Sequence, residues 1–190
     1  MRRALLGPLL ALALLPPAEG KVLVTPEEAL ALVFPGCAVE RRTLYLSPEQ
    51  VREAEQRAGT RLVSAIVHPY VALREGRPEG WALFDTHVVR TLAETLMVAI
   101  GADGRLRRVE VIAFDEPPDY LPRPEWYRQF DGRPLDPELE LRHAIRPVTG
   151  ASLSARAATD AARRALALFD LLAPDAAPSG GAPAPPPPRP

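Results

Sequence analysis

A run of small and hydroxyl residues, VTGASLS, stands directly before a long helical pattern near the C-terminus. Its hydroxyls belong to Thr149, Ser152 and Ser154, and Gly150 and Ala151 separate the first two. One interpretation is helix capping, in which Ser152 or Ser154 accepts hydrogen bonds from first-turn N–H groups. The other is phosphate binding, because free N–H groups and a positive dipole end at a helix N-terminus attract anions.

The segment TGASLS is similar to the S/T-G-A-T/S signature of the FMN-binding domain in flavin subunits of sodium-pumping NADH:quinone oxidoreductases and Rnf-type complexes. In that family a flavin transferase links FMN, through its phosphate, to the last hydroxyl residue of the signature. The resemblance implies covalent attachment at Ser152, with Thr149, Gly150, Ala151 and Leu153 as the surrounding binding residues.

Three further segments resemble stand-alone exported FMN-binding proteins, and the similarity covers roughly residues 60–170. They read GWALFDTHVVRT, ETLMVAIGADGRLRRVEVIAFDEPPDY and WYRQFDG. The chain departs from the family at Ser152, where threonine is usual, and at Arg146, where many members have aspartate. The histidine-glutamate-threonine-proline-glycine box of the respiratory subunits is represented only by FDEPP at residues 114–118.

Four residues outside the signature are candidates for the same binding site: His87, Arg90, Glu116 and Tyr120. His87 either faces the flavin or is a hydrogen-bonded sheet residue. Arg90 either contacts the phosphate or the ring edge, or it lies at a solvated strand end. Glu116 either shapes the pocket or is an ordinary turn carboxylate. Tyr120, together with Trp126, either covers the ring system or packs in the core.

The composition argues against several other classes of site. Cys37 is the only cysteine, so an internal disulfide or a multi-cysteine metal site is excluded. The three histidines lack the spacing of metal ligands, so no metal site is predicted. The sequence shows no set of a nucleophile, a general base and a residue that orients the base, so a hydrolase is not indicated. No catalytic residue is assigned. A formal charge of −1 gives no excess of positive charge that would indicate nucleic-acid binding.

Capping signals predict two helices before the sheet. The first has Thr25 as its N-cap and ends at Pro35–Gly36. The second has Ser47 as its N-cap, Gln50 at capping-box spacing and Gly59 as its terminator. A third helix is predicted from about Ser154 to Leu172, because its apolar residues form one stripe. On its polar face, Asp160 and Arg164 have the spacing of an i,i+4 ion pair.

Four runs between these helices have strand character, at 62–67, 81–89, 95–100 and 106–114. The segment GADG at 101–104 reads as the hairpin turn between the last two. Residues 115–148 are rich in proline and aromatic residues, which indicates an ordered loop with a short helix around 125–130. We therefore predict a single α+β domain: an antiparallel sheet of about four strands, N-terminal helices and a C-terminal amphipathic helix.

The ends of the chain differ in composition from this domain. Residues 1–20 have the order of a secretory signal peptide, with two arginines, an apolar run too short to span a bilayer, and small residues. Residues 21–59 are predicted to be an N-terminal helical segment and 60–173 the FMN-binding domain. Residues 174–190 form a Pro/Ala-rich tail with the composition of a disordered segment.

The resemblance implies an exported flavoprotein, periplasmic or otherwise extracytoplasmic and membrane-associated, that relays electrons between membrane or periplasmic redox partners. FMN exchanges one or two electrons, and a phosphoester tether prevents its loss outside the cytoplasm. This is electron transfer rather than the activity of a stand-alone enzyme. A flavin transferase is the implied modifying partner, with an unidentified donor and acceptor. The alternative is a flavin-free exported interaction or assembly module.

Overall fold

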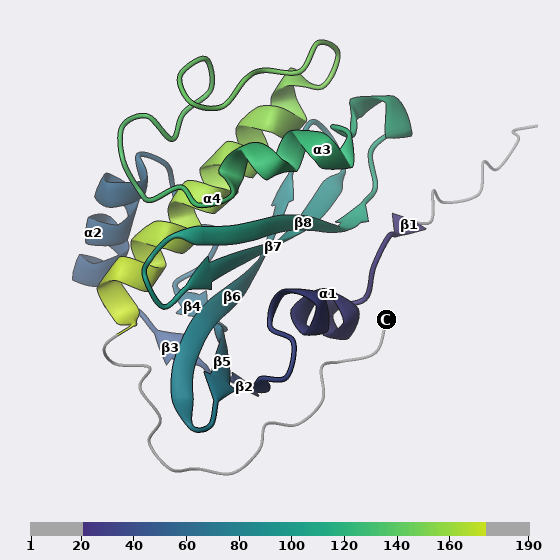
Figure 1. Ribbon diagram of the computed structural model, residues 1–190. Helices are drawn as coiled ribbons and strands as arrows, with labels where there is room; N and C mark the ends of the chain where they lie inside the picture. The colour runs from purple at the N-terminus through teal and green to yellow at the C-terminus, as the bar shows by residue number, and fades with distance from the viewer. Residues whose placement is uncertain (1–20, 174–190) are drawn as a thin grey trace, which may run out of the picture.

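One six-stranded antiparallel sheet organises residues 21–173, the part of the chain that the computed structural model describes (Figure 1). The strand order is β1-β8-β7-β6-β5-β2. The strands are β1 (Lys21–Val22), β2 (Ala38–Arg41), β5 (Tyr70–Arg74), β6 (Arg77–Val88), β7 (Ala93–Gly101) and β8 (Leu106–Phe114). Two short strands, β3 (Leu44–Tyr45) and β4 (Ile66–Val67), form a separate pair. The predicted α+β class with an antiparallel sheet is confirmed, and the expected strand number is close.

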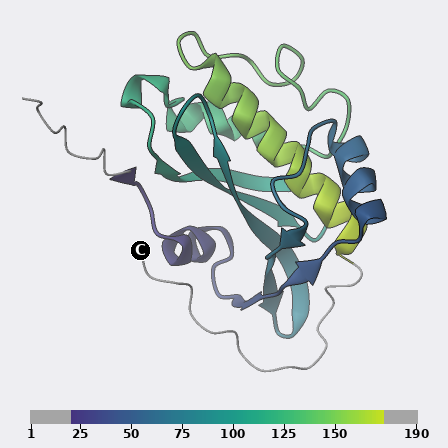
Figure 2. The same ribbon diagram turned by 180° about the vertical axis from the view of Figure 1, so that it is seen from behind.

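Helices cover both faces of the sheet, as Figures 1 and 2 show from opposite sides. The long helix α4 (Ser152–Leu172) packs on one face with α2 (Pro48–Ala58) and α3 (Pro124–Tyr127). The short helix α1 (Pro26–Val33) covers the other face. Each face therefore has its own apolar core, and the larger core lies under α4.

Local capping chemistry sets the bounds of the N-terminal helices. The Thr25 side chain accepts from Glu28 N–H, and the Glu28 carboxylate accepts in return from the Thr25 backbone. Ser47 and Gln50 form the same reciprocal capping box at α2. Gly59 ends α2 with φ of +70°, a conformation that favours glycine. These predicted helix ends are confirmed.

Strand β8 has the predicted bounds, and the turn after Gly101 joins it to β7 as expected. The strand predicted over 62–67 is wrong for most of its length, because only Ile66–Val67 is extended and paired. Strands β2 and β5 were not predicted from the sequence. The turn between β5 and β6 contains Glu75 and Gly76, both with positive φ, and Glu-Gly is not a strong hairpin signal.

The N-terminal segment at 21–59 belongs to the same sheet as the rest of the described chain. β1 pairs with β8 at one edge, and β2 pairs with β5 at the other. Within 21–173, no helix combines the length and apolarity that a bilayer crossing requires. The signal peptide predicted for 1–20 and the tail predicted for 174–190 lie outside the described residues.

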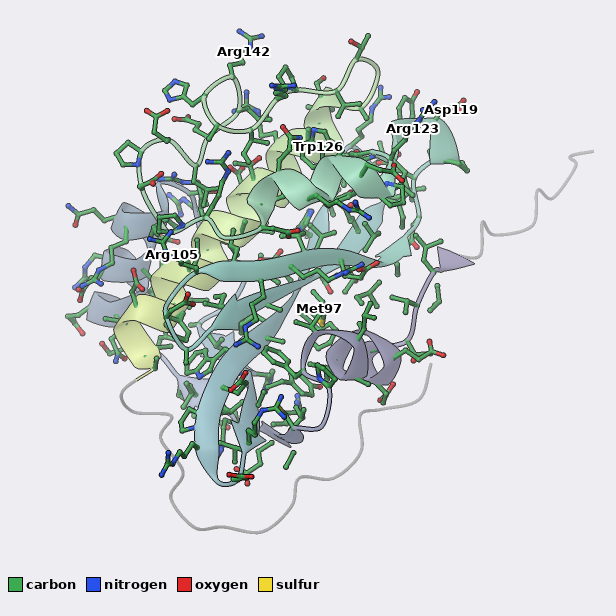
Figure 3. All side chains as sticks on the ribbon, in the orientation of Figure 1. Met97, Arg105, Asp119, Arg123, Trp126 and Arg142 are labelled. Atoms are coloured by element: carbon green, nitrogen blue, oxygen red, sulfur yellow. The ribbon has the colours of Figure 1, made fainter. Side chains whose placement is uncertain are left out.

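Two 3-10 turns connect β8 to the helical layer: η1 (Pro118–Tyr120) and η2 (Arg128–Phe130). With α3 they confirm the short helix expected around 125–130. The Trp126 indole N–H donates to the Arg146 C=O at 2.7 Å, and Arg146 N–H donates to Gln129 Oε1 at 2.9 Å. Figure 3 shows Trp126 on α3, above the sheet. These bonds fasten the chain shortly before it enters α4.

Candidate functional site

Helix α4 begins without a side-chain cap. Its N-cap residue is Ala151, Ser152 is the first helical residue, and no side chain in the described part of the chain accepts from the first-turn N–H groups. The capping interpretation for Ser152 or Ser154 is therefore wrong, whereas the predicted helix from about Ser154 to Leu172 is close to the observed Ser152–Leu172. The Ser154 hydroxyl is buried and donates to the Tyr120 C=O at 2.6 Å, so a tertiary contact replaces the cap.

The signature residues divide by exposure. Thr149, Gly150, Ser152 and Leu153 are exposed, whereas Ala151 is buried. Gly150 has φ of +84°, which turns the chain into the helix, and a Cβ built on it would meet nothing within 4 Å. The Ser152 hydroxyl is therefore accessible at a helix end whose N–H groups lack a side-chain partner.

A groove of about 620 Å³ lies beside this helix end. It runs between the end of α2, the loop at 140–142 and the side of α4 from Ser152 to Arg163, and Leu153 also lines it. Its volume is in the range of small-molecule and cofactor sites. The groove is mainly polar, so it is suited to a charged ligand more than to an apolar one.

Five charged residues line the groove: Arg142, Arg156 and Arg163 against Glu140 and Asp160. Three positive and two negative charges leave an excess of one positive charge. Arg142 is exposed and has φ of +71°, a rare conformation for a residue with a side chain. Figure 3 shows its side chain projecting outward from the loop. Burial raises the pKa of Asp160, although the neighbouring Arg164, Arg156 and Arg163 oppose this shift.

The turn between β6 and β7 is fastened by Glu116. One carboxylate oxygen accepts from the N–H groups of Arg90, Thr91 and Leu92, at 3.0, 2.7 and 2.9 Å. Hydrogen bonds from Thr91 and Leu92 hold the pKa of Glu116 below its usual value. A buried carboxylate that organises a turn in this way is a structural feature, as the ordinary interpretation of Glu116 anticipated.

Arg90 and Tyr120 lie close to the start of α4. The Arg90 guanidinium stacks on the Tyr120 ring, with its Cζ 4.5 Å from the ring centroid. Tyr120 in turn accepts the hydrogen bond from Ser154 described above. The structure therefore gathers Arg90, Glu116 and Tyr120 at the end of the molecule where α4 begins.

His87 has a different environment, inside the sheet–helix layer. Its Nδ1 lies 2.8 Å from an Asp85 oxygen, and its Nε2 lies 3.1 Å from a Glu94 oxygen. Burial alone would lower the pKa of His87, but the two carboxylates raise it to about 9. Both ring nitrogens are engaged, so the position corresponds to the hydrogen-bonded sheet residue rather than to a free ligand contact.

Arg164 completes this network. Its Nε and Nη2 each donate to one Asp85 oxygen at 2.8 Å, so the predicted ion pair with Asp160 is wrong. Burial would raise the pKa of Asp85, but bonds from His87 and Arg164 lower it to about 2. Glu94, the fourth member of this network, is fully buried.

The network formed by Asp85, Glu94 and Arg164 was not predicted from the sequence. The available signal was the alternation of Asp85 and His87 along β6, which puts both side chains on one face of the sheet. Tyr127 lies beside Glu94, and burial raises its pKa above the usual range, with a further contribution from that carboxylate. Among residues 21–173, no cluster of three His, Cys, Asp or Glu side chains is placed to hold a metal ion.

Comparison with known proteins gives no relative: no protein-family model, curated protein or solved structure matches the chain. The chemical interpretation therefore depends on the residues themselves. The accessible Ser152 hydroxyl, the uncapped helix end and the arginine-containing groove are the three features that it has to explain.

Proposed function

We propose that the chain is an exported flavoprotein that holds FMN through a phosphoester to Ser152 and relays electrons between redox partners. The observation that carries the proposal is the exposed Ser152 hydroxyl at an uncapped helix N-terminus, within the segment TGASLS. A capping serine would have its side-chain oxygen occupied by backbone N–H groups. Here the hydroxyl is left for another role.

The groups around Ser152 suit a phosphate. First-turn N–H groups and the positive end of the α4 dipole stabilise negative charge within about one turn of the helix. Arg142 and Arg156 line the adjoining groove, whose net positive charge complements a phosphodiester. Its volume of about 620 Å³ also leaves space for a group larger than a phosphate.

Three of the other candidates, Arg90, Glu116 and Tyr120, support the site from the other side of the helix end. Glu116 fixes the β6–β7 turn, and this turn presents Arg90 over Tyr120. Ser154 links Tyr120 to α4, so the turn, η1 and the helix end are held together. A rigid surround keeps a tethered ligand oriented. FMN would supply the capacity to exchange one or two electrons, and the chain would supply attachment and orientation.

Co-expression with a flavin transferase tests this proposal. We expect a yellow protein whose flavin fluorescence persists through denaturing electrophoresis, whereas expression without the transferase gives the unmodified chain. Ser152→Ala should lose the fluorescent band. Ser64→Ala is the matched control, because it removes an exposed serine hydroxyl outside the signature and should keep the band.

Redox titration of the modified protein then tests electron transfer. Its visible flavin absorption should bleach with dithionite and return with a soluble quinone or ferricyanide. An unmodified chain in the presence of a transferase that modifies a control substrate would contradict the flavin assignment. That result would favour the flavin-free interaction module.

A further inference from the structure

Strand β6 has an open edge over its second half. β5 pairs with β6 only between Arg77 and Ala82, whereas β7 continues to pair with it as far as Val88. Within residues 21–173, no other strand pairs with residues 83–88 of β6. An unpaired strand edge presents backbone N–H and C=O groups that another extended chain can bind.

Two hydrogen bonds establish which residues of β6 bond to β7. Ala102 N–H donates to the Glu79 C=O at 3.1 Å, and Val89 N–H donates to the Leu92 C=O at 3.1 Å. These bonds lie at the two ends of one continuous β6–β7 register. Because residues alternate between bonded and non-bonded pairs in an antiparallel ladder, the odd-numbered residues from 79 to 89 bond to β7.

The even-numbered residues therefore direct their backbone groups to the open edge. They are Phe84, Thr86 and Val88, and no described residue forms a backbone hydrogen bond with their N–H or C=O groups. Thr86 is exposed, and Val88 is 65% exposed. This part of the edge contains neither proline nor lysine, the residues that commonly protect exposed strands.

A groove of about 500 Å³ follows this edge. Four consecutive residues of β6, at 83–86, line it, although successive side chains of a strand point to opposite faces. The groove must therefore run along the strand edge. Its other wall includes the segment at 62–68 and Leu168 of α4. Val63 and Ile66 on that wall are 57% and 46% exposed, so the groove has apolar surface to bury.

The charges in the groove favour an acidic ligand. Arg164 and Asp85 line the groove but neutralise each other through their bidentate pair. Arg41 also lines it and forms no ion pair with any described residue. One positive charge therefore remains available to a carboxylate.

We propose that an extended segment of a partner polypeptide, with apolar residues and at least one carboxylate, adds as a strand to the Phe84–Val88 edge of β6. The edge supplies backbone hydrogen bonds, the groove receives side chains, and Arg41 pairs with the carboxylate. The wall at 62–68 borders the edge, so a single extended chain fits where the sheet edge of a second copy would meet the same wall. This site is independent of flavin attachment.

A random linear-peptide phage library, selected against the full chain, tests the proposal. We expect enrichment of peptides that alternate apolar and other residues and contain Asp or Glu. The synthetic peptides should bind the purified chain in fluorescence anisotropy titrations. N-methylation of alternate peptide amides should abolish binding in one register and spare it in the other, because only every second residue bonds to the edge.

Thr86→Pro and Thr86→Val form a matched pair for this test. Both lose the bond between the Thr86 and Thr95 hydroxyls, but only proline removes the backbone N–H. That N–H faces the open edge, so proline removes no ladder bond of the fold. Thr86→Pro should weaken the selected peptides by about tenfold or more, and Thr86→Val should have little effect.

Arg41→Gln should weaken acidic peptides roughly twofold to fivefold, the size of an exposed ion pair, whereas Arg77→Gln at the far end of β6 should not. Failure to enrich any peptide would overturn the proposal. Equal binding to the Thr86→Pro and Thr86→Val variants would do the same. Should circular dichroism show that Thr86→Pro is unfolded, the N-methylated peptides decide: equal binding in both registers contradicts strand addition.

Discussion

Two regions of helix α4 use polar side chains in opposite ways. At its start, Ser152 is exposed and the first-turn N–H groups have no side-chain cap. Twelve residues later, about 18 Å along the helix axis, Arg164 is buried and both Asp85 oxygens accept from it. In the second region the charged side chain is paired within the fold. The first retains capacity for a ligand, and this difference separates a binding site from a structural network.

The largest effect should come from breaking the buried network. Arg164→Met leaves Asp85 without its bidentate partner, and removing one member of a buried ion pair costs about 3–5 kcal/mol. Arg156→Met, at an exposed position on the same helix, should change the free energy of unfolding by less than about 0.5 kcal/mol. Urea denaturation of both variants measures the difference. Equal stabilities would show that the network contributes nothing specific.

The second effect is a loss of stability in alkaline solution. The pKa of His87 is about 9 in the folded protein, against 6.5 for a free histidine. Its stabilising contribution is therefore complete below pH 6.5 and declines as the pH rises through 9, because the unfolded chain loses this proton first. The decline should be about 3 kcal/mol, because one pKa unit corresponds to about 1.4 kcal/mol and the side chain is only 10% exposed, so solvent screens it little.

Unfolding free energies measured between pH 6 and pH 10 check this decline, and His87→Gln should flatten it. A wild-type curve that is flat over this interval, or a His87→Gln curve with the same slope, would exclude an imidazolium between Asp85 and Glu94. Ser152→Ala serves as the control from the other region of α4, because it should leave the dependence of stability on pH unchanged.

The smallest effect should be at Ser152 itself. Ser47 caps α2, and Ser47→Ala should cost about 1 kcal/mol. Ser152→Ala removes an exposed hydroxyl that caps nothing, so its cost should stay below about 0.5 kcal/mol. Thermal unfolding of the unmodified proteins compares them. A loss at Ser152 as large as that at Ser47 would restore the capping interpretation.

The features predicted correctly from the sequence depend on neighbours in the chain. Thr25 and Ser47 meet partners three residues away, and the turn after Gly101 is closed by local geometry. The strand β8 also follows its own residue pattern. In these segments the residues that form the sequence pattern are the same residues that make the local contacts.

The predictions that failed concern side chains whose hydrogen-bond partners are distant in the sequence. Arg164 has Asp160 four residues away but pairs with Asp85, which is 79 residues away. Ser154 could have capped α4, yet its hydroxyl bonds to Tyr120 across the tertiary fold. Residue spacing within a helix cannot predict these contacts, because they depend on how α4 lies over the sheet.

The candidate site shows the same division. The signature around Ser152 was visible in the sequence, and so were Arg90, Glu116 and Tyr120 as separate candidates. Their gathering at one end of the molecule results from the Glu116 bonds to the β6–β7 turn and from the contact between Tyr120 and α4. Arg142 had no sequence signal, since it reaches the groove through a loop with an unusual backbone conformation.

Peptide mass mapping of the protein co-expressed with an active flavin transferase tests the central claim most directly. The account predicts one FMN adduct, carried by Ser152, and an unmodified but folded chain in the Ser152→Ala variant. The peptide contains Thr149 and Ser154 as internal controls, so fragmentation must separate the three hydroxyls. An adduct on Thr149 or Ser154, or a peptide without any adduct, would contradict the assignment.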